Sequence, residues 1–151
     1  MQRISIILFQ YAGFLLVCGL ASVLYSAETR TAGWNGHGIS GLIACGSAAV
    51  IIAITAVLAG KGKGNAVWAA LGLAFILLSY GGFTFFKLVR DIPGNATEMI
   101  NKRAADKKED LKREDAERAI TYKAGVFGVM ALFSLSAFVR LGTAVRNEKT
   151  A

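Results

Sequence analysis

The chain has 151 residues, of which 54% are hydrophobic, and a formal net charge of +7 at pH 7. This length suits one domain and is too short for two domains of ordinary size. The positive charge does not indicate a nucleic-acid partner. Thirteen of the 27 charged residues fall in the nearly balanced stretch 101–118, and no aromatic residues alternate with basic ones as a single-strand binding surface requires.

Outside 101–118, long runs without Asp, Glu, Lys or Arg predict membrane-spanning helices. Three such runs exceed the roughly 20 apolar residues that a helix needs to cross a bilayer core of about 30 Å. A fourth run, 124–139, reaches this length if Lys123 and Arg140 extend their charged ends to the two interfaces. We therefore predict four spans, at about 5–25, 39–60, 65–87 and 121–142.

A soluble bundle with buried helices is the alternative to a membrane protein. Its helices would carry polar residues at every third or fourth position of an outer face. The segment "LIACGSAAVIIAITAVLA" (42–59) has only small hydroxyl side chains as polar groups. The expected fold is therefore all-α, an integral membrane four-helix bundle in which residues 1–151 form a single membrane domain.

The N-terminal segment could also be a signal peptide, because it combines a basic start, an apolar run and small residues at 19–21. The apolar run continues past this site to Tyr25, which is too long for an ordinary signal peptide. We interpret it as a retained first helix. Further along the chain, "AGKGKGN" (59–65) predicts a tight basic hairpin whose glycines end the second helix and begin the third.

The connection between the third and fourth spans begins with "DIPGNATE" (91–98). Pro93 and Gly94 are expected to break the third helix, and Asn95 with Glu98 fits a capping box. From there to Ile120 no helix breaker occurs, so the sequence predicts one continuous, protruding polar helix over about 98–120. A helix of about 26 residues here would reach roughly 40 Å from the bilayer. Two interpretations stay open, a solvated loop or a stalk held by another protein. In the second, the expected partner contacts are Lys102, Arg103, Lys107, Leu111, Arg113 and Arg118.

The distribution of basic residues predicts the orientation of the four spans. Ten basic residues lie between Lys87 and Lys123, against six on the side of the two termini. The positive-inside rule then places the third connection on the cytoplasmic or matrix side.

Residues suited to catalysis or metal binding are scarce. No predicted span has an acidic or basic residue in its central part, as a proton relay or ion site would require. His37 is the single histidine, and Cys18 and Cys45 lie within helices, where thiols behave as small apolar groups. We therefore predict no catalytic residue, metal site or cofactor, and no enzymatic activity.

Small residues recur at four-residue spacing in the predicted spans. Such faces let helix backbones approach closely. They predict a helix-packing role for Gly41, Cys45, Ala49, Ala124 and Gly128.

Three segments support a family resemblance: Tyr11-Ala12-Gly13 with Gly19, "SGLIACG" (40–46) and "KAGVFGVMALF" (123–133). Together they resemble the transmembrane-protein-14 family of small four-helix organellar proteins, which are associated with moving haem precursors or fatty acids. The resemblance implies a carrier fold in a membrane. The long charged insertion before the last helix departs from the compact pattern of that family.

Two hypotheses about function remain. The first is a non-catalytic accessory subunit of a larger membrane complex, in the mitochondrial inner membrane, with other membrane subunits and bilayer lipids as partners. The second is a small carrier or exporter of a lipophilic molecule, as the family resemblance implies. An enclosed apolar cavity of roughly 300 Å³ or more would favour the carrier, and a filled bundle would favour the subunit.

Overall fold

The computed structural model describes residues 2–28, 37–105 and 112–150, without the side chains of 24–28, 37–40, 103 and 148–150. All elements in these ranges are helices, which confirms the all-α prediction. The helices are α1 (Gln2–Glu28), α2 (His37–Gly60), α3 (Gly64–Arg90), α4 (Ile92–Ala105) and α5 (Arg113–Thr150).

Four of these helices are long and apolar enough to cross a membrane. The candidate spans are Gln2–Val23, Gly41–Gly60, Gly64–Arg90 and Arg113–Asn147. By length and composition, these four helices fit a multi-pass membrane protein, as the charge-free runs predict.

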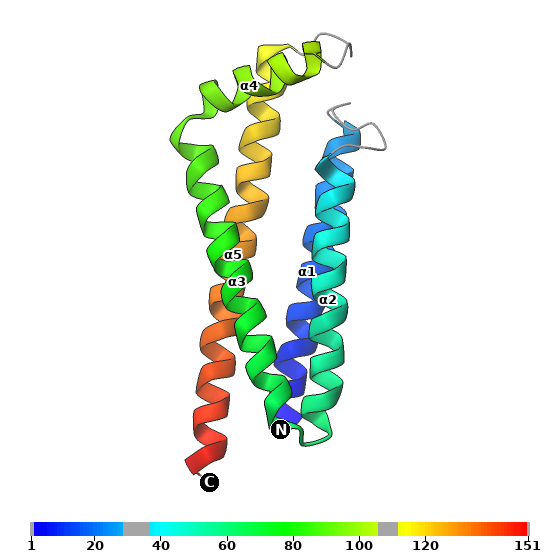
Figure 1. The fold of residues 1–151 in the computed structure, drawn as a ribbon, viewed down its shortest axis with the longest axis vertical. Coiled ribbons are helices and arrows are strands. Elements are labelled where there is room, and N and C mark those ends of the chain that lie inside the picture. Colours follow the sequence, from blue (N-terminus) through cyan, green and yellow to red (C-terminus); the bar gives the residue numbers. More distant parts are fainter. Residues whose placement is uncertain (1, 29–36, 106–111, 151) are drawn as a thin grey trace.

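The long helices form two antiparallel hairpins (Figure 1). Helix α1 packs chiefly against α2, and α3 packs chiefly against α5. The two chain termini lie at the end of the bundle that holds the α2–α3 turn, and α4 lies across the opposite end. These two ends are called below the terminal end and the α4 end.

The turn between the hairpins is a Schellman motif. The Gly62 amide donates to the Ala59 carbonyl at 2.9 Å, and the Lys63 amide donates to the Leu58 carbonyl at 3.1 Å. Gly62 has a φ of +82°, a left-handed conformation that glycine adopts without steric cost. The basic hairpin predicted here thus ends α2 and starts α3 within three residues.

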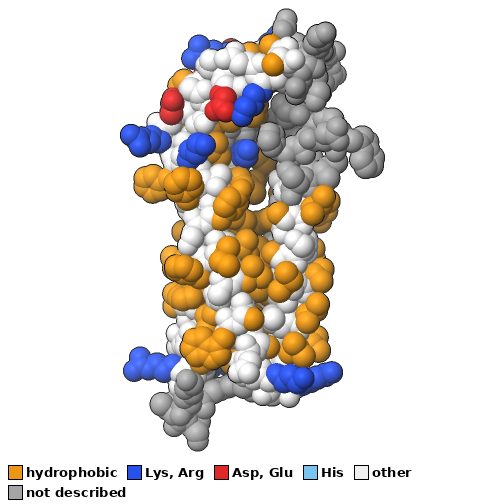
Figure 2. All heavy atoms as spheres, viewed as in Figure 1, with side chains coloured by type: hydrophobic (Ala, Val, Ile, Leu, Met, Phe, Trp, Pro, Cys, Tyr) orange, Lys and Arg blue, Asp and Glu red, His pale blue; other side chains and the backbone are white. Residues whose placement is uncertain are grey.

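The outer surface has the pattern of a protein in a bilayer. Figure 2 shows a broad band of hydrophobic side chains, with Lys and Arg side chains at both of its edges. Phe83 and Phe86 on α3 are among the most exposed apolar side chains, at 72% and 74%. Aromatic groups this exposed would be unfavourable in water and are well placed in lipid.

The interior is divided between two clusters of buried side chains. The larger cluster joins all four long helices and includes the fully buried Leu8, Leu15, Ile52 and Leu141. The second lies at the α4 end and joins α3, α4 and α5 without α1 or α2. Its buried members are Leu88, Ala96, Ala116, Ile120 and Ala124.

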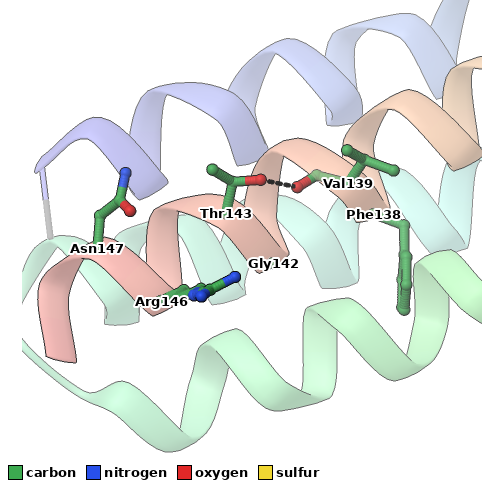
Figure 3. Close-up of a pocket in the computed structure, with 6 residues that line it drawn as sticks. All are labelled: Phe138, Val139, Gly142, Thr143, Arg146 and Asn147. Carbon is green, nitrogen blue, oxygen red and sulfur yellow. Dashed lines mark hydrogen bonds between the residues drawn. The ribbon is translucent and has the colours of Figure 1, made fainter. Parts of the chain in front are cut away.

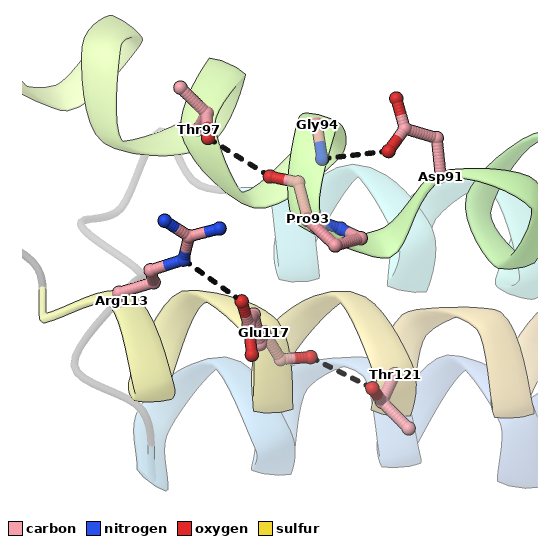
Figure 4. Close-up of polar contacts among 7 residues, drawn as sticks. All are labelled: Asp91, Pro93, Gly94, Thr97, Arg113, Glu117 and Thr121. Atoms are coloured by element: carbon pink, nitrogen blue, oxygen red, sulfur yellow. Dashed lines mark hydrogen bonds and ion pairs between the residues drawn. The ribbon is translucent and has the colours of Figure 1, made fainter.

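The break between α3 and α4 lies at Asp91, four residues before the predicted cap (Figure 4). The Asp91 carboxylate accepts a hydrogen bond from the Gly94 amide at 2.9 Å, so Asp91 caps the N-terminus of α4. Asn95 lies within α4, and its side-chain amide donates to the carbonyls of Lys87, Leu88 and Asp91. The prediction of a helix start at Asn95 is wrong, because the Asn95 amide instead satisfies carbonyls at the end of α3.

The prediction of one continuous helix over 98–120 is also wrong. Helix α4 ends at Ala105, Lys112 lies outside any helix, and α5 begins at Arg113. The physical reason is burial: Ala96 on α4 and Ala116 on α5 are both fully buried in the second cluster. This contact requires the chain to fold back, so α4 packs across the bundle end and does not project from it (Figure 1).

We expect Asn95→Ala to loosen the docking of α4 by roughly 1 kcal/mol, because it leaves carbonyls at the end of α3 without their side-chain donor. Hydrogen exchange should rise across 92–100. Asn101→Ala, at an exposed position of the same helix, serves as the control and should leave exchange unchanged. Equal exchange in the two variants would contradict the bridging role of Asn95.

Candidate functional site

The two hairpins meet at a buried polar contact in the middle of the bundle. The Tyr11 hydroxyl on α1 and the Ser134 hydroxyl on α5 lie 2.6 Å apart, and both side chains are buried. Beside this contact, the rings of Phe14 and Phe133 stack with centroids 3.8 Å apart. A hydrogen bond between spans is favourable in lipid, where a lone hydroxyl has no water to bind. The contact therefore holds α1 against α5.

The other buried hydroxyl group is also satisfied within the bundle. Thr55 Oγ1 donates to the Ile52 carbonyl at 2.7 Å. Among the residues with described side chains, Thr55 and Ser134 are the buried polar ones. In the same part of the chain, no group of three or more His, Cys, Asp or Glu residues is arranged to hold a metal ion. The buried hydroxyl groups of the described core are therefore already hydrogen-bonded.

The small residues singled out on α2 lie along the α1–α2 contact. A Cβ added at Gly41 would lie 2.5 Å from Ser22 Oγ, and Ala49 is buried in the main cluster. Cys45 is half-buried and lies against Gly19 of α1, where an added Cβ would be 3.2 Å from Cys45 Cβ. The structure therefore brings Gly41, Cys45 and Ala49 together on one helix-packing face.

The small residues singled out on α5 lie against α3 and α4. Ala124 is buried in the second cluster, and a Cβ at Gly128 would meet the Phe85 ring at 3.0 Å. The sequence reasoning missed the tightest approach of this hairpin, at Gly81 of α3. A Cβ there would lie 2.9 Å from Met130 Cε and 3.2 Å from the Phe127 carbonyl oxygen. The Gly81-Gly82 pair within an apolar run was the signal that could have identified it.

Only some of the residues predicted to contact a partner lie in the described part of the structure. Lys102 bonds Glu98 within α4 at 2.6 Å. Arg113 bonds Glu117 within α5 at 3.1 Å, as Figure 4 shows. Arg118 is exposed at the α4 end. The Arg103 side chain, Lys107 and Leu111 lie outside the described residues. Exposed pairs of this kind contribute little to stability, so they influence the helices only slightly.

In the described part of the chain, two open grooves lie along α5. The larger lies at the terminal end, and all of its lining residues come from α5 (Figure 3). Its volume of about 640 Å³ would hold a small ligand, but a groove lined by one helix does not enclose one. The second groove lies at the α4 end and is lined by Glu114, Glu117, Arg118, Thr121 and Tyr122.

These features define a class: an all-helical protein with four helices that can span a membrane, built from two tightly packed hairpins and a docked polar helix. Comparison with protein-family models, with curated proteins and with solved structures finds no match.

Proposed function

We propose that this protein is a non-catalytic accessory subunit of a larger membrane complex. The observation that carries the proposal is the interior of the bundle, in which apolar side chains fill the main cluster and the buried hydroxyls bond one another or the backbone. A catalytic or transport site needs polar groups that remain available to a substrate. The hydroxyl groups of Tyr11, Ser134 and Thr55 are instead hydrogen-bonded within the bundle.

The α4 end is the surface where we place the contact with other subunits. It carries the acidic and basic side chains of α4 and of the first turns of α5, whereas most of the remaining described surface is apolar. Arg118 and the groove beside it present charges that a soluble or interfacial domain of a partner can recognise. The basic residues of this end favour the matrix or cytoplasmic side, and we propose the mitochondrial inner membrane as the location.

A carrier for a lipophilic molecule is the alternative function, and it rests on the resemblance to the transmembrane-protein-14 family. The two grooves along α5 give it less support than an enclosed cavity would, because each is lined by a single helix. A carrier would move a fluorescent fatty acid across liposomes that contain only this chain. The subunit proposal expects no transport above that of empty liposomes.

The subunit proposal is tested by co-purification from native membranes in a mild detergent. We expect other polypeptides to co-purify in fixed ratio, and Arg118→Glu to reduce their yield severalfold while membrane insertion is unchanged. Lys61→Glu, at the terminal end, reverses one charge in the same way and should leave the yield unchanged. A full yield with Arg118→Glu would contradict the proposed contact, and transport by the chain alone would contradict the subunit role.

A further inference from the structure

Three lysines from three different helices converge at the α4 end. Lys87 lies in the last turn of α3, Lys102 lies on α4, and Lys123 lies on α5. Lys87 and Lys123 are direct chain neighbours of Leu88 and Ala124, which are buried together in the second cluster. On α4, Met99 packs against the same cluster, and Lys102 lies one turn after it. The convergence is therefore built by the fold and does not follow from sequence proximity.

The charges at this junction are not balanced by the described residues. Lys123 is half-buried, and the described charges that act on it are those of Lys102 and Lys87, both of its own sign. Glu98 is the nearby carboxylate: it bonds Lys102 at 2.6 Å and also feels the charge of Lys87. Around Lys123 the described charges are therefore positive, and Glu98 offsets them through its pair with Lys102 only in part. Like charges held close together repel one another, and a bound anion reduces this repulsion.

Glu98 keeps its negative charge at neutral pH. Its hydrogen bond to Lys102 lowers the pKa of the carboxyl group, so it is ionised well below pH 7. The positive excess is thus not increased by protonation of Glu98 under ordinary conditions. An added anion would interact with the three lysines in the presence of this one carboxylate.

Lys87 lies in the last turn of the candidate span Gly64–Arg90, at the depth expected for lipid headgroups. Figure 2 shows Lys and Arg side chains beside the hydrophobic band at this end of the molecule. Phe83 lies one turn before Lys87 on the same face of α3 and is 72% exposed. A phosphate at the lysines would therefore have an apolar side chain beside it on the membrane side, where an acyl chain can pack. Basic pockets between spans are suited to anionic headgroups.

We infer that Lys87, Lys102 and Lys123 form a binding site for the phosphate group of an anionic phospholipid, with the acyl chain lying along α3 over Phe83. The chemistry shared with a free phosphate ion is the attraction of a phosphate oxyanion to three ammonium groups. The exposed phenyl ring favours the lipid as the source of that phosphate.

The site is tested by native mass spectrometry of the full chain in detergent. Phosphatidylglycerol is titrated against phosphatidylcholine with the same acyl chains. The wild-type chain is expected to prefer phosphatidylglycerol. Combined Lys87→Gln, Lys102→Gln and Lys123→Gln should weaken its binding by about a hundredfold, since each lysine near a headgroup contributes about fivefold. Binding of phosphatidylcholine should stay unchanged. Lys102→Gln alone, at a side chain that is 73% exposed, avoids disturbing the fold and should cost about fivefold.

Two matched variants distinguish a built site from general surface charge. Lys61→Gln, Lys63→Gln and Arg140→Gln remove the same charge elsewhere and should preserve the preference for phosphatidylglycerol. Arginine at all three junction positions retains the charge and should preserve binding. Equal losses in the two neutralised variants, or full binding without the junction lysines, would overturn the inference. Displacement of phosphatidylglycerol by millimolar inorganic phosphate would show an ion site and overturn the lipid assignment.

Discussion

Gly81→Leu is expected to separate α3 from α5 and to be among the most destabilising single changes in the chain. A Cβ at this position would lie 3.2 Å from the Phe127 carbonyl oxygen and 3.4 Å from the Ala131 amide nitrogen, so the backbone of α5 itself must move. Overpacking of this kind costs about 1–3 kcal/mol, and occasionally more. The midpoint of unfolding in a denaturing detergent should fall accordingly.

The neighbouring glycine supplies the control for this change. At Gly82 an added Cβ meets nothing within 4 Å, so Gly82→Leu adds the same apolar volume toward open space. In a bilayer such a change should be nearly neutral. If the two variants unfold at the same detergent concentration, the close approach of α3 and α5 at Gly81 is wrong.

Gly19→Leu is expected to open the α1–α2 hairpin by the same mechanism. Gly19 is buried, and an added Cβ would lie 3.2 Å from Cys45 Cβ and 3.4 Å from the Leu42 Cα. Close approach of backbones is the main source of attraction between helices in lipid, where apolar burial contributes little. We expect a loss of about 1–3 kcal/mol, measured as increased accessibility of Cys45 to a membrane-permeant thiol reagent.

Gly13 on the same helix provides the comparison for Gly19. It is exposed, and a Cβ there would meet nothing within 4 Å. Gly13→Leu should leave the reactivity of Cys45 at the wild-type level. Equal reactivity in the Gly19 and Gly13 variants would contradict the α1–α2 packing described here.

The spans could be predicted because their signal is local. A helix in a bilayer must be apolar over its own length, so the charge-free runs mark α1, α2, α3 and α5 without knowledge of their neighbours. The turn at Gly62 was equally readable, since glycines between basic residues end one helix and release the next.

The contacts between helices were less predictable because they depend on partners distant in sequence. Four-residue spacing shows that Gly41 can pack closely, but only the three-dimensional structure shows that it faces Ser22. Asp91 and Asn95 are both good helix caps, and tertiary structure decides that Asn95 serves the end of α3 instead. The helix expected over 98–120 has no internal breaker, yet burial of Ala96 against α5 outweighs that local preference.

The surface and the interior together support the proposal that this protein is a subunit of a membrane complex. Its core holds apolar side chains and hydroxyls that are already bonded, while the charges gather at the α4 end beside a docked polar helix.

The most direct test of the proposed subunit role is the mass of the native particle. The chain has a mass of 16.0 kDa. It should be purified in mild detergent from its own membranes and measured by native mass spectrometry. If the chain is a subunit, the particle should be much larger than the chain and should release several different polypeptides in fixed ratio on dissociation. A particle that contains only this chain, as a single copy or a small multiple of its mass, would contradict the subunit role.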